Sequence, residues 1–125
     1  MFAIASGVDL LQIDRLTRLD PAIRKRFLVR VFTSRELEEC GNRDDSLAGR
    51  FAAKEAAVKA LGCGIGEVGW KDVEVIEDER GKPRLILHTA AQEIAKRAGW
   101  ISWSVSISHT GDHAVATVTA LIDQA

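Results

Sequence analysis

The sequence has few residues of several informative kinds: no tyrosine, two cysteines, two prolines and one methionine among 125 residues. Two cysteines are too few for a disulfide framework, and Cys40 and Cys63 lack zinc-ligand spacing, so we expect reduced thiols in a cytoplasmic protein. No apolar run reaches the roughly 18 residues that a membrane span needs. The apolar N-terminus has no preceding basic residue, which argues against a signal peptide.

Net charge is also low. Lys and Arg number 17 against 18 Asp and Glu, which gives a net charge of −1. This balance argues against bulk attraction to nucleic acid or to an anionic membrane. Apolar residues make up 46% and charged residues 28% of the chain, as in ordinary globular domains and unlike disordered chains, collagen or coiled coils. The length predicts one domain over residues 1–125, with a core that needs no covalent staples.

The hydrophobic pattern predicts an α+β fold with a mainly antiparallel sheet and a helical block after the first strand. Asp9 is expected at the C-terminal end of that strand. The predicted elements, in chain order, are a strand at 2–8, helices at 21–31, 34–40 and 46–61, strands at 70–77 and 84–88, a helix at 89–98, and strands at 103–109 and 113–122.

The helix at 34–40 has the clearest boundary signals. Thr33 is a candidate N-cap and Glu36 stands three residues later, which is the pattern of a capping box. Phe32 and Leu37 have the spacing of a hydrophobic staple across that N-terminus. Gly41 is expected to end the helix.

The helix at 46–61 carries charges beside its apolar stripe. Lys54 falls in the middle of that stripe, and Glu55 and Lys59 lie one turn apart at its edge. In one interpretation Glu55 and Lys59 form a surface ion pair while Lys54 extends to water. In the other, a carboxylate and an amine are held at the rim of a cleft. The stripe consists of Leu47, Phe51, Val58 and Leu61.

Asp9 is a second candidate for chemistry. It could cap the segment that follows the first strand, a common role for aspartate. Alternatively, Asp9 and Glu55 could share a divalent cation, since a cation between two close carboxylates removes their repulsion. Magnesium commonly takes one or two carboxylates together with water and substrate phosphates. This pair would therefore suit a metal and phosphate site.

Two further stretches could contact a phosphate. The glycine-rich run at 62–66 would let backbone amides approach closely, but it follows a helix C-terminus and lacks the spacing of a Walker loop. The stretch Ser106–Thr110 places His109 at a strand end, either as an ordinary edge histidine or as a donor to a phosphate or base. A serine hydrolase is less favoured, because no G-x-S-x-G motif occurs.

Residues 15–35 form a basic segment with a single acid, Asp20. On a nearly neutral protein, such a segment favours one acidic partner over bulk polyanion binding, although a solvated helix face would look the same. Phe27 could anchor that partner or belong to the core. The basic residues are Arg15, Arg18, Arg24, Lys25, Arg26, Arg30 and Arg35.

Several of these stretches together resemble the holo-[acyl-carrier-protein] synthases, the small group of 4′-phosphopantetheinyl transferases. The resemblance covers nearly the whole chain. The matching stretches are GVDLLQIDR (7–15), FTSRELE (32–38), LAGRFAAKEAAVKALGCGIG (47–66), GKPRL (81–85) and SISHTGDHAVATV (106–118). Cys63 departs from the pattern, since a threonine is common there.

The resemblance implies a Mg²⁺-dependent enzyme of fatty acid biosynthesis. Such an enzyme moves phosphopantetheine from coenzyme A to a serine of apo acyl carrier protein and releases adenosine 3′,5′-bisphosphate. By the same resemblance, Asp9 and Glu55 bind the metal, Lys59 lies near the phosphates, and the protein is a homotrimer with sites between subunits. The implied coenzyme A residues are Arg50, Lys59, Gly62, Gly64, Gly66, Ser108, His109 and Thr110. The implied carrier-protein residues are Arg15, Arg18, Arg24, Arg26 and Phe27.

Two alternatives and three details stay open from the sequence. The chain could be a non-catalytic module that binds coenzyme A or a nucleotide, although intact Asp9, Glu55 and Lys59 argue against it. It could bind RNA through residues 15–35, although that segment lacks a set of stacking aromatics. The preference for Mg²⁺ over Mn²⁺, the carrier proteins served and the general base, Glu55 or a metal-bound water, are also open.

Overall fold

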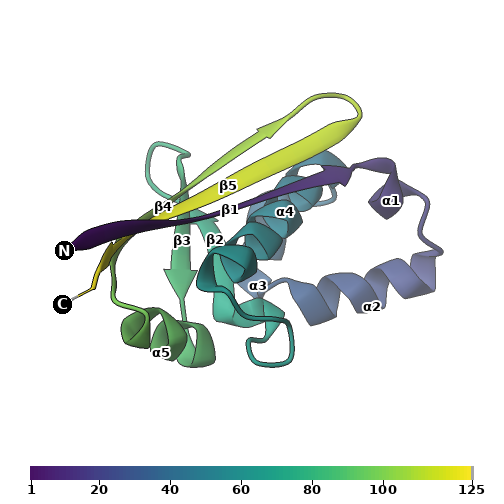
Figure 1. Ribbon diagram of the computed structural model, residues 1–125. Helices are drawn as coiled ribbons and strands as arrows, with labels where there is room; N and C mark the ends of the chain where they lie inside the picture. Colours follow the sequence, from purple (N-terminus) through teal and green to yellow (C-terminus); the bar gives the residue numbers. More distant parts are fainter. Residues whose placement is uncertain (125) are drawn as a thin grey trace.

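The structure, a computed structural model, describes residues 1–124. The element order confirms the predicted α+β class, with a helical block after the first strand (Figure 1). The elements are β1 (Phe2–Gln12), α1 (Asp14–Thr17), α2 (Pro21–Val31), α3 (Ser34–Cys40), α4 (Asp44–Leu61), the short 3₁₀ helix η1 (Trp70–Asp72), β2 (Val73–Glu77), β3 (Pro83–Leu87), α5 (Thr89–Arg97), β4 (Trp100–His109) and β5 (His113–Asp123).

The strands form two antiparallel sheets, one three-stranded in the order β1-β5-β4 and one two-stranded from β2 and β3. The antiparallel pairing is as predicted, whereas the separation into two sheets was not. Figure 1 shows β1 and β5 side by side along the top of the molecule, with α4 running beneath them. In the part of the chain that the structure describes, no helix has the length and apolar character needed to cross a membrane.

β1 is longer than the sequence pattern predicted. Asp9 was expected to end the strand, but β1 continues to Gln12, and Asp9 pairs with Ala116 in the strand interior. The cause is the central strand β5, whose partner residues continue beyond this pair to His113. Tertiary pairing thus extends a strand that the local pattern alone ended too early.

Small residues bring the sheet close to α4. A Cβ on Gly7 would lie only 2.0 Å from the carbonyl oxygen of Ala56, so no larger residue fits between β1 and α4 without displacing backbone. Similarly, a Cβ on Gly49 would lie 2.8 Å from Cγ2 of Ile107 in β4. The close packing of β1 on α4 places Asp9 beside the middle of the helix.

The helix boundaries largely follow the local signals. The capping box of α3 is confirmed: Glu36 Oε1 accepts from the Thr33 amide at 2.8 Å, and Thr33 Oγ1 accepts from the Glu36 amide at 3.2 Å. α4 starts two residues earlier than predicted, at Asp44, and ends where predicted at Gly62, whose φ of 73° is left-handed. The predicted strand at 70–77 begins only at Val73, because 70–72 form η1.

The core consists of two clusters. One lies between α4, the sheet, the β2–β3 hairpin and α5, and the other lies between the first three helices and the N-terminal half of α4. The second contains Phe27, whose ring packs edge-on against Phe51 at 5.2 Å and Phe32 at 6.2 Å between centroids. Phe27 therefore packs against the core from a partly buried position, and its contact with a carrier protein stays a prediction.

Lys54 does not extend to water, as one interpretation of its position expected. Its side chain is 0% exposed and pairs with the equally buried Glu36 at 2.8 Å. The ammonium group also donates to the carbonyl oxygens of Trp70 and Val73, and Glu36 Oε2 accepts from the Val75 amide. The buried pair thus hydrogen-bonds backbone groups at the outer edge of β2 that another strand would otherwise pair.

A candidate active site shared by β1 and α4

Asp9, Glu55 and Lys59 meet where β1 crosses α4. Lys59 Nζ donates to Asp9 Oδ1 at 3.1 Å and to the carbonyl oxygen of Val8 at 3.0 Å. The Asp9 side chain is 12% exposed, whereas the Lys59 side chain is 56% exposed. Lys59 therefore bonds across to β1, and the i,i+4 surface pair with Glu55 is not what fixes its position.

The carboxyl groups of Asp9 and Glu55 lie close together. Burial, a hydrogen bond to Asp9 and the negative charge of Asp9 together raise the pKa of Glu55 to about 7, while the charges of Lys59 and Arg15 oppose this rise. Two partly buried carboxylates this close repel each other, and the single nearby ammonium group offsets that repulsion only in part. A hard divalent cation between them would offset it. Among residues 1–124, no three His, Cys, Asp or Glu side chains are placed so that they could hold a metal ion together, so a cation on Asp9 and Glu55 would need further ligands such as water or substrate oxygens.

The raised pKa predicts a pH dependence of stability in metal-free buffer. The pKa of Glu55 is about 7 in the folded state against an ordinary 4.5. Between pH 4.5 and 7, the folded state therefore keeps a proton on Glu55 that the unfolded state has lost. The stability from this group is present below about pH 4.5 and is lost as the pH rises through 7. Urea titrations in EDTA should therefore show the free energy of unfolding falling between pH 5 and 7 more steeply in the wild type than in Glu55→Gln. Parallel pH profiles of the two proteins would contradict this prediction.

A pocket of about 540 Å³ opens beside Lys59, on the outer face of the sheet. Its lining combines the ammonium group with small and hydroxyl-bearing residues. These lining residues are Ser6, Gly7, Val8, Lys59, Thr117 and Thr119. Of the cluster of Asp9, Glu55 and Lys59, only Lys59 lines this pocket.

Arg50 and His109 line a second pocket, of about 220 Å³, near the N-terminus of α4. His109 Nδ1 lies 3.9 Å from Asp45 Oδ2. Sequence reasoning missed the other lining residues, although the stretch GKPRL that carries two of them had been noted for its resemblance. The lining residues are Asp45, Ser46, Gly49, Arg50, Glu77, Gly81, Pro83, Ile107 and His109.

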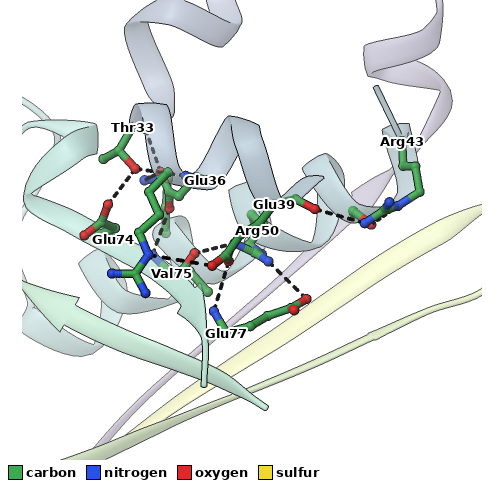
Figure 2. A network of polar contacts seen from close by, with 11 residues as sticks. Thr33, Glu36, Glu39, Arg43, Arg50, Glu74, Val75 and Glu77 are labelled. Atoms are coloured by element: carbon green, nitrogen blue, oxygen red, sulfur yellow. Dashed lines mark hydrogen bonds and ion pairs between the residues drawn. The ribbon is translucent and has the colours of Figure 1, made fainter. Parts of the chain in front are cut away.

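Arg50 is held by a polar network at the edge of β2 (Figure 2). Its Nη1 donates to Glu39 Oε1 at 2.9 Å and to the carbonyl oxygen of Val75 at 2.6 Å, and its Nη2 donates to Glu77 Oε1 at 3.3 Å. The Arg50 side chain is only 6% exposed. The guanidinium group is thus fixed in orientation and reaches the pocket only at its edge.

The coenzyme A residues implied by resemblance do not converge within one chain. Arg50 and Glu55 are five positions apart on α4, which places their side chains about 140° apart around the helix. The loop of Gly62, Gly64 and Gly66 follows the C-terminus of α4, whereas Ser108, His109 and Thr110 lie near its N-terminus. The 18 residues of α4 span about 27 Å. Within a single chain these expected residues therefore form two separate groups, which we call half-sites.

The basic segment is partly paired. Arg24 forms an ion pair with Asp44, and Arg18 lies 3.5 Å from Asp14. Arg26 is exposed on α2. Two apolar side chains of the same helix are also exposed, Ile23 by 48% and Val29 by 58%. This face of α2, more than Phe27, offers apolar contact beside positive charge.

Comparison with known proteins places the chain in a family. Residues 5–118 match the 4′-phosphopantetheinyl transferase superfamily. The holo-[acyl-carrier-protein] synthase of Herpetosiphon aurantiacus is 45% identical over 125 residues, covering 94% of this chain and 98% of the relative. That of Moorella thermoacetica is 42% identical, covering 96% and 94%.

Solved structures agree. The Helicobacter pylori holo-[acyl-carrier-protein] synthase in complex with coenzyme A superposes with a TM-score of 0.82 at 31% identity, covering 92% of this chain and 98% of that one. The Bacillus anthracis enzyme in complex with CoA (3′,5′-ADP) gives 0.77 at 35% identity, covering 98% and 100%. The chain therefore belongs to the 4′-phosphopantetheinyl transferase superfamily and, within it, to the holo-[acyl-carrier-protein] synthases.

Proposed function

We propose that this protein transfers 4′-phosphopantetheine from coenzyme A to a serine of apo acyl carrier protein in fatty acid biosynthesis. The observation that carries the proposal is the approach of the Asp9 and Glu55 carboxyl groups, with Lys59 bonded to Asp9. Family membership over nearly the whole chain supports it. The free thiols Cys40 and Cys63 are consistent with a cytoplasmic location.

Asp9 and Glu55 would hold Mg²⁺, with water and the diphosphate of coenzyme A supplying the remaining ligands. When bound, the ion would neutralise charge on the diphosphate and polarise the attacked phosphorus. Lys59 would offset charge that develops on the phosphoryl oxygens, because its ammonium group is held at the mouth of a pocket by Asp9 and the Val8 carbonyl.

The serine hydroxyl must lose its proton as it attacks. The serine oxygen forms a bond to the phosphorus that carries pantetheine, and the bond from that phosphorus to adenosine 3′,5′-bisphosphate breaks. Glu55 or a water held by the metal would accept this proton, since both would lie beside the attacking oxygen. A positioned base of this kind contributes typically 10²–10⁴-fold to the rate.

The two half-sites support a homotrimer in which coenzyme A lies between neighbouring copies. Asp9, Glu55 and Lys59 of one copy would then face Arg50 and His109 of the next. The outer face of β1 supports burial in an assembly, because four of its large apolar side chains are more than half exposed, and such a patch commonly marks an interface. They are Phe2 at 66%, Ile4 at 71%, Val8 at 55% and Leu10 at 64%. Light scattering measures the oligomeric state. A preparation that is monomeric by light scattering and fully active in transfer assays would contradict this arrangement.

The exposed basic face of α2 is proposed to dock the acidic carrier protein. Arg26→Glu should raise the KM for carrier protein by roughly tenfold, since a like charge replaces an attractive one at the interface, and should leave the KM for coenzyme A nearly unchanged. Steady-state kinetics with each substrate varied in turn will measure both. Arg97→Glu on α5, at the other end of the molecule (Figure 1), is the matched control. Equal effects on both KM values would refute the docking assignment.

Intact-mass spectrometry of the carrier protein tests the function itself. Incubation with this protein, coenzyme A and Mg²⁺ should add one phosphopantetheine group to apo carrier protein, and EDTA should prevent it. A carrier protein with alanine in place of the acceptor serine should gain no mass. Binding of coenzyme A without any mass gain would instead indicate a non-catalytic coenzyme A module, and RNA binding with a steep salt dependence would favour a nucleic-acid role.

A further inference from the structure

Glu77 occupies the side of Arg50 that faces the 220 Å³ pocket. Its carboxylate lies 3.3 Å from Arg50 Nη2, and both residues line the pocket together with His109. Figure 2 shows Glu77 reaching Arg50 from the opposite side to Glu39. The one edge of the guanidinium group that borders the pocket therefore already has an anionic partner from this chain.

The two carboxylates on Arg50 are held very differently. Glu39 is 20% exposed, and its Oε1 accepts from both Arg50 Nη1 at 2.9 Å and the Glu77 amide at 3.0 Å. The Glu77 side chain is 46% exposed, and its single bond to Arg50 is the longest of those that the guanidinium group makes. Glu39 is thus a fixed anchor, whereas the Glu77 side chain can turn into solvent while its backbone stays in place.

The charges in the pocket oppose an entering anion. Glu77 and Asp45 both line it, against one permanent cation, Arg50, and one histidine, His109, which faces Asp45. A phosphate group could pair with Arg50 Nη2 only after the Glu77 carboxylate had moved away. Glu77 thus occupies the position beside Arg50 that an anionic ligand would take.

We propose that Glu77 is a displaceable counter-ion of Arg50 that competes with a phosphate group of coenzyme A and thereby sets the affinity of this half-site. The inference rests on the proposed function, because it takes coenzyme A as the ligand. It assigns to Glu77 a role in setting coenzyme A affinity that the site residues implied by resemblance do not include. The same competition weakens binding of the adenosine 3′,5′-bisphosphate product and so favours its release.

Glu77→Gln tests the proposal, because it removes the charge while keeping the shape of the side chain. The KM for coenzyme A and the Kd measured by titration calorimetry should both fall by roughly twofold to fivefold, the range that corresponds to a partly exposed ion pair. The KM for carrier protein should not change. Glu79→Gln is the matched control, because Glu79 is an exposed acid of the same hairpin that does not line the pocket.

Two further comparisons identify the mechanism. In an Arg50→Gln background the effect of Glu77→Gln should vanish, because the competition acts through Arg50. If Glu77→Gln strengthens the binding of coenzyme A but not that of 3′-dephospho-coenzyme A, the phosphate that competes with Glu77 is the 3′-phosphate. Equal gains in affinity for the two ligands identify the diphosphate. The comparison of Glu77→Gln with Glu79→Gln stands alone if Arg50→Gln does not fold.

The proposal is overturned if an active wild-type protein gives an unchanged or higher KM for coenzyme A with Glu77→Gln, or if Glu79→Gln gives the same gain. A purely structural role for Glu77 predicts weaker binding, the opposite sign. A wild-type protein that does not modify carrier protein at all would instead refute the proposed function, so the two failures are distinguishable.

Discussion

Asp9→Asn and Glu55→Gln are each expected to lower kcat/KM by about three orders of magnitude, because each removes a carboxylate from the proposed metal site. Neither should unfold the protein. In the absence of metal, the negative charges of Asp9 and Glu55 repel each other and destabilise the folded state, as the raised pKa of Glu55 indicates. Neutralising one of them relieves that repulsion, so stability in EDTA at pH 8 should stay equal or increase.

Loss of activity without loss of stability distinguishes a functional pair from a structural one. Steady-state kinetics and urea denaturation of the same preparations will show the two effects separately. Glu38→Gln, which neutralises an exposed acid on α3, is the matched control and should change neither. Near-normal turnover by Glu55→Gln, or a fall in stability that accounts for its inactivity, would contradict the assignment.

Lys54→Met is expected to have the largest effect on stability, about 3–5 kcal/mol, because it leaves the fully buried Glu36 without its cation. The carbonyl oxygens of Trp70 and Val73 also lose their donor. Burial lowers the pKa of Lys54, although the charge of Glu36 opposes this. The pair therefore stabilises the fold mainly by satisfying the edge of β2, and not by the ion-pair energy alone.

A double replacement separates these contributions. Glu36→Leu combined with Lys54→Met removes both buried charges, so it should recover part of the lost free energy of unfolding, but not all, because the Val75 amide and the Val73 carbonyl stay unpaired. Lys96→Met, at an exposed position of α5, is the control and should change stability by less than about 0.5 kcal/mol. A loss below about 1 kcal/mol for Lys54→Met would contradict the buried-pair account.

Local signals explain which parts of the fold were predictable. α3 was predicted correctly because Thr33, Glu36 and Gly41 mark its ends within nine residues of sequence. Lys54 was open to misreading because its partner Glu36 belongs to another helix and its other partners are carbonyl groups near β2. Nothing in the periodicity of α4 identifies contacts so distant in the chain.

The site was predictable to a similar extent. Residue type and resemblance were enough to name Asp9 and Glu55, and the structure brings their carboxyl groups together. The bond from Lys59 to β1 depends on the close packing that Gly7 permits, which no pattern in α4 reveals. Glu77 escaped notice because a charged residue at a strand end ordinarily faces solvent, and only the fold places it on Arg50.

The most direct test of the central claim is a calorimetric titration of the coenzyme A-loaded protein with Mg²⁺. If Asp9 and Glu55 jointly hold the ion, the wild type should bind one equivalent per chain, and Asp9→Asn and Glu55→Gln should each bind at least about tenfold more weakly. Indistinguishable titrations of all three proteins would show that these two carboxylates do not hold the metal.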